Sequence, residues 1–237
     1  MSCMDARTTI VNWSAVELEL HEKGYYHSPG FLTSEETDHF IEHYDDHAAY
    51  RKTVVMERHR FGKGEYKYFN YPLPPRVNEI RQSLYPHLVP VANLWMQQLR
   101  MKTVYPPTLN ELLTLCRRSD QYLATPLILR YGVGGFNTLH QDLYGGVYFP
   151  FQAVIMLNES GRDFEGGEFV LIQQTPRAQS KAIVLAPKKG DMVIFTTNFR
   201  PIEGKLGYYR TSVKHGVSEV RWGVRHTLGI IFHDAVT

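Results

Sequence analysis

The chain has 237 residues, of which 43% are hydrophobic and 21% are charged. This is the composition of an ordinary globular protein, and it excludes the disordered and fibrous classes. The formal net charge of +2 is too small to create a long-range field, so a polyanionic partner would have to be attracted by local clusters of basic residues.

The first half of the chain carries helical patterns. Thr33 and Glu36 form a capping box, which predicts a helix over residues 33–44. Further helices are expected over residues 91–99 and 109–116, where apolar side chains recur at spacings of three and four. Prolines separate these last two helices.

From residue 126 onward the pattern changes to short β-rich runs separated by glycines. The runs cover residues 126–131, 151–158, 166–174, 181–187, 191–195 and 225–232. With the segments around His140 and His215 they give about eight strands, enough for a jelly roll. We therefore predict a single α+β domain that covers residues 1–237. Residues 1–125 would be mainly helical support that buttresses one sheet, with a candidate substrate flap at 51–71, and residues 126–237 a double-stranded β-helix (jelly roll) core.

Cysteine usage and hydropathy indicate the compartment. Cys3 and Cys116 are far apart in the sequence, so a disulfide framework is not expected and a reducing compartment is favoured. The first residues lack the apolar stretch of a signal peptide, and no run approaches the roughly 20 apolar residues that span a bilayer. We therefore expect a cytoplasmic protein with no membrane partner.

A His-x-Asp pair, His140 and Asp142, follows a strand-like segment that contains glycine. In extended backbone, residues two apart point to the same side, so these two side chains can share a metal ion. A second pair, His43 and Asp45, falls in the first expected helix, where residues two apart point in different directions. The later pair is therefore the candidate site.

A third ligand from a separate strand would complete the face of two histidines and one carboxylate that holds mononuclear Fe(II) and leaves three positions open. His215 is the leading candidate, because it precedes the final strand and lies ten residues before Arg225. His226 and His233 compete for this role. The first faces away from Arg225 along the strand, and the second lies close to residue 237.

Arg225 begins a strand whose alternate residues form two faces. One face carries Arg225, Thr227, Gly229 and Ile231, and the other carries His226, Leu228, Ile230 and Phe232. An arginine inside an apolar jelly roll requires an anion, and its planar guanidinium suits a carboxylate. 2-Oxoglutarate offers this carboxylate, while its keto acid end can chelate Fe(II) and leave one position for O2. We assign Arg225 and Thr227 to this co-substrate.

The order of these motifs, His140-Gln-Asp142, then His215, then Arg225, resembles the superfamily of 2-oxoglutarate- and Fe(II)-dependent oxygenases. The resemblance implies a dioxygenase that couples decarboxylation of 2-oxoglutarate to succinate with hydroxylation of a C–H bond. The iron ligands would also be its catalytic residues. A non-enzymatic, cupin-like metal-binding scaffold or sensor is the alternative, and Arg225 argues against it.

Within this superfamily, Arg130-Tyr-Gly-Val-Gly134 followed by Leu139-His-Gln-Asp142 resembles the AlkB group of nucleic-acid dealkylases. This resemblance assigns to Tyr131 a hydrogen bond to 2-oxoglutarate. The segments HQDLYGG, FPFQ, DFEGGEF, HGVS and LGIIFHDA, within about residues 56–235, resemble a family of short oxygenases described as oxidising damaged nucleic-acid bases. Ile231 departs from the AlkB pattern, because it stands where those enzymes have a second arginine.

Phe31-Leu-Thr-Ser-Glu-Glu resembles the opening helix of prolyl hydroxylases. Oxidative demethylation of a damaged base therefore has an alternative, hydroxylation of prolyl peptides, free amino acids or other small molecules. The expected partner is a nucleic acid or a modified base, with a peptide or a small molecule as the alternative.

Substrate contacts are expected in two places. The segment 51–71 interleaves basic and aromatic residues, and we assign Arg58, Tyr66 and Tyr68 to phosphate contact and to stacking on an extruded base. The bland alternative is a strand with its aromatic residues toward the core and its charges in water. Near the metal, we assign Gln141, Tyr144 and Gln152 to substrate orientation, with the alternative that Gln152 points outward.

Overall fold

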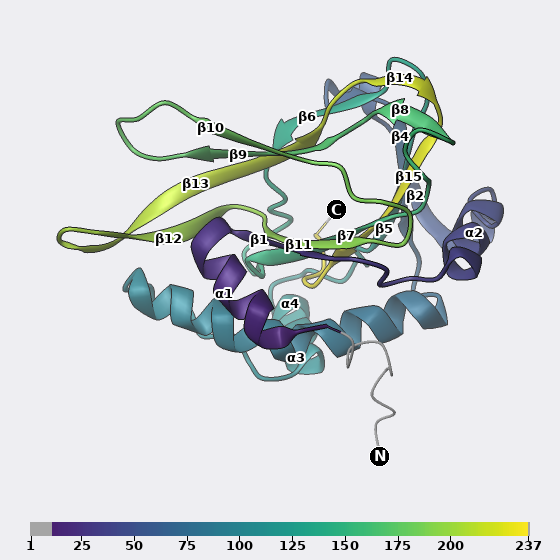
Figure 1. Cartoon of the computed structure of the whole chain (residues 1–237). Coiled ribbons are helices and arrows are strands. Elements are labelled where there is room, and N and C mark those ends of the chain that lie inside the picture. Colours follow the sequence, from purple (N-terminus) through teal and green to yellow (C-terminus); the bar gives the residue numbers. More distant parts are fainter. Residues whose placement is uncertain (1–10, 237) are drawn as a thin grey trace.

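The computed structural model describes residues 11–236, so the statements made above about Cys3 and the first residues lie outside it. Two antiparallel sheets face one another, and helices cover one of them (Figure 1). The predicted α+β double-stranded β-helix is therefore confirmed. No helix between residues 11 and 236 has both the length and the apolar character needed to cross a bilayer.

Four helices and two short 3-10 turns support the sheets. They are α1 (Trp13–Lys23), α2 (Ser34–Glu42), α3 (Pro75–Gln98) and α4 (Leu109–Arg118), with η1 (His47–Ala49) and η2 (Met56–His59). The predicted capping box of α2 is present, since Thr33 Oγ1 accepts from Glu36 N and Glu36 Oε2 accepts from Thr33 N. His43, placed in this helix from the sequence, is its C-terminal cap.

Helix α3 is longer than the sequence pattern indicated. The helix expected at 91–99 is only its last part, and α3 runs through Pro86 and Pro90. Each internal proline removes one backbone hydrogen bond, but the helix buries a long apolar face that includes Ile80 and Leu84. Burial of that face outweighs the lost bonds.

The larger sheet has seven strands. In spatial order they are β1 (Tyr25–Ser28), β11 (Met192–Thr196), β7 (Phe151–Met156), β15 (Arg225–Ile231), β5 (Leu127–Tyr131), β4 (Glu65–Phe69) and β2 (Tyr50–Val55). Helices α1 and α3 pack against this sheet, and α4 packs on α3 (Figure 1). The helices therefore buttress one sheet, as predicted.

The smaller sheet carries the remaining long strands. In spatial order they are β10 (Lys181–Leu185), β9 (Phe169–Gln174), β13 (Gly207–Val217), β6 (Phe136–His140) and β3 (Gly62–Lys63), with β12 (Phe199–Gly204) paired to β13. Strands β14 (Val220–Gly223) and β8 (Phe164–Gly166) form a separate pair. Every strand expected after residue 126 is present, and β8, β12 and β14 are additions.

The segment 51–71 is mostly strand, which was the alternative interpretation of its sequence. Most of it forms β2 and β4, which extend the larger sheet beside β5. Gly62 and Gly64 both have positive φ, and a Cβ on either would meet backbone oxygen at under 3.0 Å. These glycines therefore serve close backbone approach, and a mobile flap stays a prediction.

Strand register brings two pairs of residues together in the space between the sheets. His215 on β13 is the direct partner of His140 on β6. Arg225 on β15 is the direct partner of Tyr131 on β5. Side chains of directly opposed residues share one face of the sheet and have Cβ atoms about 5 Å apart. Each pair therefore presents two functional groups at one spot.

The two faces predicted for β15 are confirmed. Arg225, Thr227, Gly229 and Ile231 line the cavity between the sheets. Leu228 and Ile230 belong instead to the large apolar cluster that joins this sheet to the helices. The alternation of side chains along one strand thus separates the core from the site.

Candidate metal centre and co-substrate site

His140, Asp142 and His215 form the cluster predicted from the sequence. Their nearest ligand atoms all lie within 4.8 Å of one another. Asp142 Oδ1 is 3.5 Å from His140 Nε2, and Asp142 Oδ2 is 3.3 Å from His215 Nε2. Two imidazole nitrogens and a carboxylate are the donor set of mononuclear Fe(II) oxygenases. The residues present therefore fit an iron ion.

The two imidazoles are prepared for a metal in different ways. His140 Nδ1 lies 2.8 Å from Thr138 O, so this nitrogen carries the proton and Nε2 has a free lone pair. His215 is almost fully buried, and burial lowers its pKa. The neutral imidazole, which is the metal-binding form, is therefore favoured at His215.

Asp142 is ionised despite its burial. Burial alone would raise the pKa of this carboxyl, but the hydrogen bonds that it accepts from His215 and Tyr144 hold it well below its usual range. Tyr144 Oη donates to Oδ1 at 2.7 Å, and Gln152 Nε2 donates to Oδ2 at 3.0 Å. Both carboxylate oxygens are therefore fixed by donors from outside the histidine pair.

A cavity of about 250 Å³ extends from this cluster between the sheets. The opposite wall is formed by the larger sheet and includes Arg225 and Thr227 from β15 and Tyr131 from β5. The remaining lining is mostly apolar and aromatic, with Leu129 and Ile231 among its residues. Such a lining with a few convergent polar groups is typical of a small-molecule site.

Arg225 has unpaired donors inside this cavity. Its side chain is 1% exposed, and its Nε and Nη1 have no hydrogen-bond partner within residues 11–236. Burial lowers the pKa of the guanidinium to about 10, which still leaves it charged at neutral pH. A buried cation with unpaired N–H groups is costly, so the site is suited to an anion such as a carboxylate.

Tyr131 adds a further donor beside Arg225. The phenol ring lies 5.5 Å from the guanidinium carbon, and its hydroxyl accepts from Asn137 Nδ2 at 3.2 Å. Burial raises the pKa of Tyr131 to about 12. The hydroxyl therefore stays protonated and can donate to a bound ligand.

The structure brings some of the predicted substrate residues to the cavity and not others. Tyr66 and Tyr68 from β4 line it, as does Tyr144, whereas Arg58 is exposed on η2. Gln141 also borders the cavity, but its Nε2 donates to the carbonyl oxygens of Asn198 and Val213. The roles of these residues in substrate binding stay predictions.

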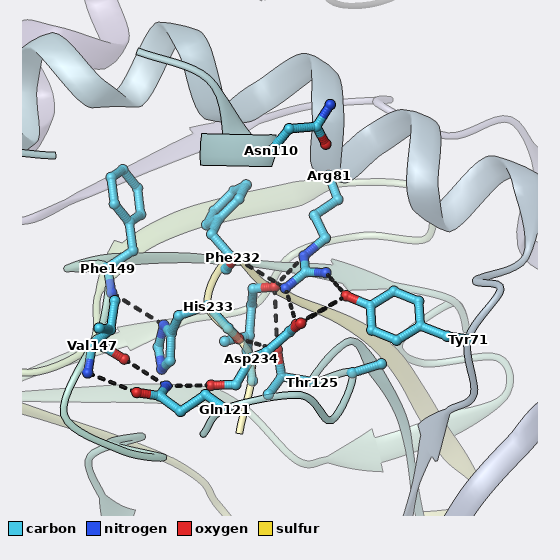
Figure 2. A network of polar contacts seen from close by, with 12 residues as sticks. Tyr71, Arg81, Asn110, Gln121, Thr125, Val147, Phe149, Phe232, His233 and Asp234 are labelled. Atoms are coloured by element: carbon cyan, nitrogen blue, oxygen red, sulfur yellow. Dashed lines mark hydrogen bonds and ion pairs between the residues drawn. The ribbon is translucent and has the colours of Figure 1, made fainter. Parts of the chain in front are cut away.

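The two competing ligands lie elsewhere. His226 Nδ1 is 3.0 Å from Asn158 Oδ1, and burial lowers the pKa of this imidazole to about 4. His233 Nδ1 accepts from Phe149 N at 3.1 Å (Figure 2). Neither joins the metal-ligand cluster found within the described residues.

Three site residues escaped the sequence reasoning. Asn137 holds the Tyr131 hydroxyl, and Thr197 Oγ1 accepts from Asp142 N at 3.2 Å. Gly167 has φ +62°, and a Cβ there would lie 2.7 Å from Arg225 Cδ. The double glycine of the DFEGGEF segment is the available sequence signal for this contact.

The fold and the ligand cluster together define a metal-dependent oxygenase of the double-stranded β-helix type. A family described as an oxygenase catalysing oxidative methylation of damaged DNA matches residues 64–235, and the chain belongs to this Oxygenase-NA family. The prediction of a 2-oxoglutarate- and Fe(II)-dependent oxygenase is confirmed at the level of class, and the cofactors of this class are Fe(II), 2-oxoglutarate and O2.

Relatives and solved structures agree with this family. An uncharacterised protein of Mycobacterium tuberculosis is 41% identical over 167 residues, which are 70% of this chain and 72% of that protein. An oxidoreductase of the 2OG-Fe(II) oxygenase family from Burkholderia pseudomallei has the same fold, with a TM-score of 0.53, 18% identity and coverage of 96% of this chain and 94% of that one. A Trichoplax adhaerens prolyl hydroxylase, in complex with a peptide fragment of the hypoxia inducible factor oxygen degradation domain, gives a TM-score of 0.55, 14% identity and coverage of 98% and 94%.

Proposed function

We propose that this oxygenase binds Fe(II) through His140, Asp142 and His215 and hydroxylates a methyl group on a damaged nucleic-acid base. The observation that carries the proposal is that two opposite walls of the cavity present complementary groups. Three metal-binding atoms converge on one side, and a buried guanidinium with unpaired N–H groups lies on the other. A metal-binding scaffold without redox chemistry gives no reason for Arg225 to be buried there at the cost of its hydration.

Arg225 and Tyr131 are the residues that would bind 2-oxoglutarate. The guanidinium has unpaired N–H groups on Nε and Nη1 to offer to a carboxylate ligand, and the Tyr131 hydroxyl retains its own hydrogen to donate. Thr227, on the same face of β15, lines the cavity beside them. When bound, iron with O2 and 2-oxoglutarate supplies oxidation of a C–H bond, coupled to decarboxylation of the co-substrate to succinate.

The cavity mouth supports a nucleic-acid substrate. Phe61 is 47% exposed and also lines the cavity, and the neighbouring Arg58 and Arg60 are exposed. Phe61 O accepts from both the backbone N and the Oγ1 of Thr138, two residues before His140. Cations beside an exposed aromatic ring suit phosphates and a stacked base.

Inside the cavity, Tyr66 and Tyr68 add aromatic surface. Their rings contact one another edge to face, with centroids 5.3 Å apart. A base that has been taken out of its stack is commonly held between such rings. The family description, which names damaged DNA, points to the same substrate class.

The test begins with the metal and the co-substrate. Anaerobic addition of Fe(II) and 2-oxoglutarate is expected to give a weak visible charge-transfer band in the native protein and none in His140→Ala. His47→Ala, which changes an exposed histidine of η1, is the matched control and is expected to keep the band. A featureless spectrum from the native protein would contradict the proposed metal site.

The same preparation then reports the substrate class through succinate and formaldehyde release. A single-stranded DNA oligonucleotide with a methylated base is expected to stimulate both products above the unmethylated oligonucleotide, because a hydroxylated N-methyl group breaks down to formaldehyde. Prolyl peptides and free proline form the comparison arms. Stimulation by these arms, without any response to methylated DNA or RNA, would exclude the nucleic-acid substrate.

A further inference from the structure

The carboxylate of Asp142 is held from two sides by groups that were first assigned to substrate. Tyr144 Oη donates to Oδ1 at 2.7 Å, and Gln152 Nε2 donates to Oδ2 at 3.0 Å. Because the two bonds reach different oxygens, they fix rotation about the Cβ–Cγ bond. Few orientations of the carboxylate then remain open to it.

Each donor is itself fixed by a second bond. Tyr144 Oη accepts from Tyr68 Oη at 3.3 Å, so its single hydrogen is committed to the carboxylate. Gln152 Nε2 also donates to Thr197 Oγ1 at 3.0 Å, and that oxygen accepts from the backbone N of Asp142. The side chain and the backbone of Asp142 are thus held by one connected set of bonds.

The loop that carries Tyr144 is anchored at several points. Gln121 brackets Val147, since its Nε2 donates to Val147 O at 2.8 Å and its Oε1 accepts from Val147 N at 2.7 Å (Figure 2). Tyr144 O accepts from Val236 N at 3.2 Å.

The chain segment after β15 is in turn tied to α3. Arg81 and Asp234 form a buried ion pair with 2.8 Å between Nη2 and Oδ1 (Figure 2). Arg81 also donates to the carbonyl oxygens of Ile231 and Phe232. A helix of the supporting layer therefore steadies the segment on which the loop with Tyr144 rests.

We propose that Tyr144 and Gln152 are positioning residues, which hold the Asp142 carboxylate ready for the metal rather than contacting the substrate. This inference rests on the proposed metal site at His140, Asp142 and His215. Groups that hydrogen-bond a ligating carboxylate orient it, and loss of such a partner typically costs 10- to 100-fold in metal affinity or activity. A residue that touches only substrate has no such effect on the substrate-free protein.

The experiment measures metal binding alone. Metal-free native protein, Tyr144→Phe and Gln152→Met are titrated with Co(II), with neither 2-oxoglutarate nor substrate present, and the visible ligand-field spectrum is recorded. Both variants keep the size of the side chain and remove the donor. We expect the Co(II) dissociation constant to rise about 10-fold or more in each, with an altered spectrum.

Tyr148→Phe is the matched control. It makes the same chemical change four residues along the same loop, at a ring that packs edge-on against Phe199 and His233. Native Co(II) affinity is expected for it. Thermal melting of each variant reports folding, and if Tyr144→Phe fails to fold, Gln152→Met decides the question.

The outcomes separate this inference from the proposed function. If native protein binds Co(II) no better than His140→Ala, the metal site itself is wrong. If native protein binds and the folded Tyr144→Phe and Gln152→Met variants bind equally well with an unchanged spectrum, the positioning role is wrong and the metal site stands. Weakened binding in Tyr148→Phe to the same degree would also overturn the positioning role, because the loop rather than the donor would then be responsible.

Discussion

Each of the two walls of the cavity carries a pair of directly opposed residues on neighbouring strands, but the two pairs differ in chemistry. On the smaller sheet, His140 and His215 oppose one another across β6 and β13, and on the larger sheet Tyr131 and Arg225 oppose one another across β5 and β15. The first wall gathers lone pairs, with both oxygens of Asp142 held by outside donors. The second gathers N–H and O–H groups, and Arg225 Nε and Nη1 are left without partners.

This difference suits one wall to orienting a metal ligand and the other to binding an anionic ligand. A metal ligand must be oriented before the ion binds, so each oxygen of the Asp142 carboxylate accepts one hydrogen bond from within the protein. A ligand-binding arginine must keep its N–H groups for the ligand, so packing rather than hydrogen bonds has to hold it. The comparison can be tested by changing the second wall and measuring the first.

The largest effect is expected from Arg225→Met, which keeps much of the side-chain volume and removes the charge. Loss of one partner from a buried, hydrogen-bonded charge pair costs about 2–5 kcal/mol, so the KM for 2-oxoglutarate should rise about 30-fold or more. Fe(II) binding should not change. Succinate release against 2-oxoglutarate concentration measures the KM, and a metal titration measures Fe(II) binding.

Arg221→Met is the control for this prediction, because Arg221 is an exposed arginine on β14 whose side chain is 64% accessible. It should leave the KM for 2-oxoglutarate at the native value. An unchanged KM in Arg225→Met would contradict the assignment of the second wall to the co-substrate.

A smaller effect is expected from Gly167→Ala. The new Cβ would lie 2.7 Å from Arg225 Cδ and 3.0 Å from Val220 Cγ2, so the guanidinium is displaced rather than removed. We expect the KM for 2-oxoglutarate to rise about 10-fold, as a sub-ångström misplacement at a binding group allows. Gly30→Ala separates contact from backbone strain, since Gly30 has φ +61° but no atom within 4 Å of its Cβ position. Equal effects in both variants would contradict the contact.

The smallest effect is expected from Tyr131→Phe, which removes one neutral hydroxyl and keeps the ring. A single neutral hydrogen bond contributes about 0.5–1.5 kcal/mol, so the KM for 2-oxoglutarate should rise about 2- to 10-fold. Because the pKa of Tyr131 is raised to about 12, this ratio should stay constant as the assay pH is raised from neutral toward 9. Tyr50→Phe is the control, because the Tyr50 hydroxyl donates to His43 O outside the cavity, and it should leave the KM for 2-oxoglutarate unchanged. A ratio of variant to native KM that falls toward one as the pH rises would argue against a protonated donor at Tyr131.

The ligand cluster and the faces of β15 could be predicted because both depend on strand periodicity. His140 and Asp142 are two residues apart in extended chain, and Arg225 and Thr227 share a face for the same reason. The strands after residue 126 have β-branched runs bounded by glycines, which is a strong local signal. Local rules were sufficient for this part of the molecule.

The remaining features depend on long-range contacts that no local pattern encodes. The sequence around Gln152 fits a side chain that points outward as well as one that points at Asp142. The pairing of β7 with β11 and β15 places this side chain inside, beside Asp142. The helical pattern of 91–99 did not reveal α3, because the internal prolines mask a helix that tertiary burial sustains. Strands β2 and β4 could be given only as an alternative, because a stretch of mixed aromatic and basic residues fits a flap as well as a strand.

The hairpin formed by β12 and β13 limits which changes of length β13 can accept before His215. His215 meets His140 at one register only, and β13 runs eight residues back from His215 to its start at Gly207. Since successive side chains in a strand point to opposite faces, a single-residue insertion between Gly207 and His215 is expected to turn the imidazole outward, away from the proposed metal site. Insertions or deletions within β13 before His215 are therefore expected to involve an even number of residues. The turn between β12 and β13 can change in length by any number of residues.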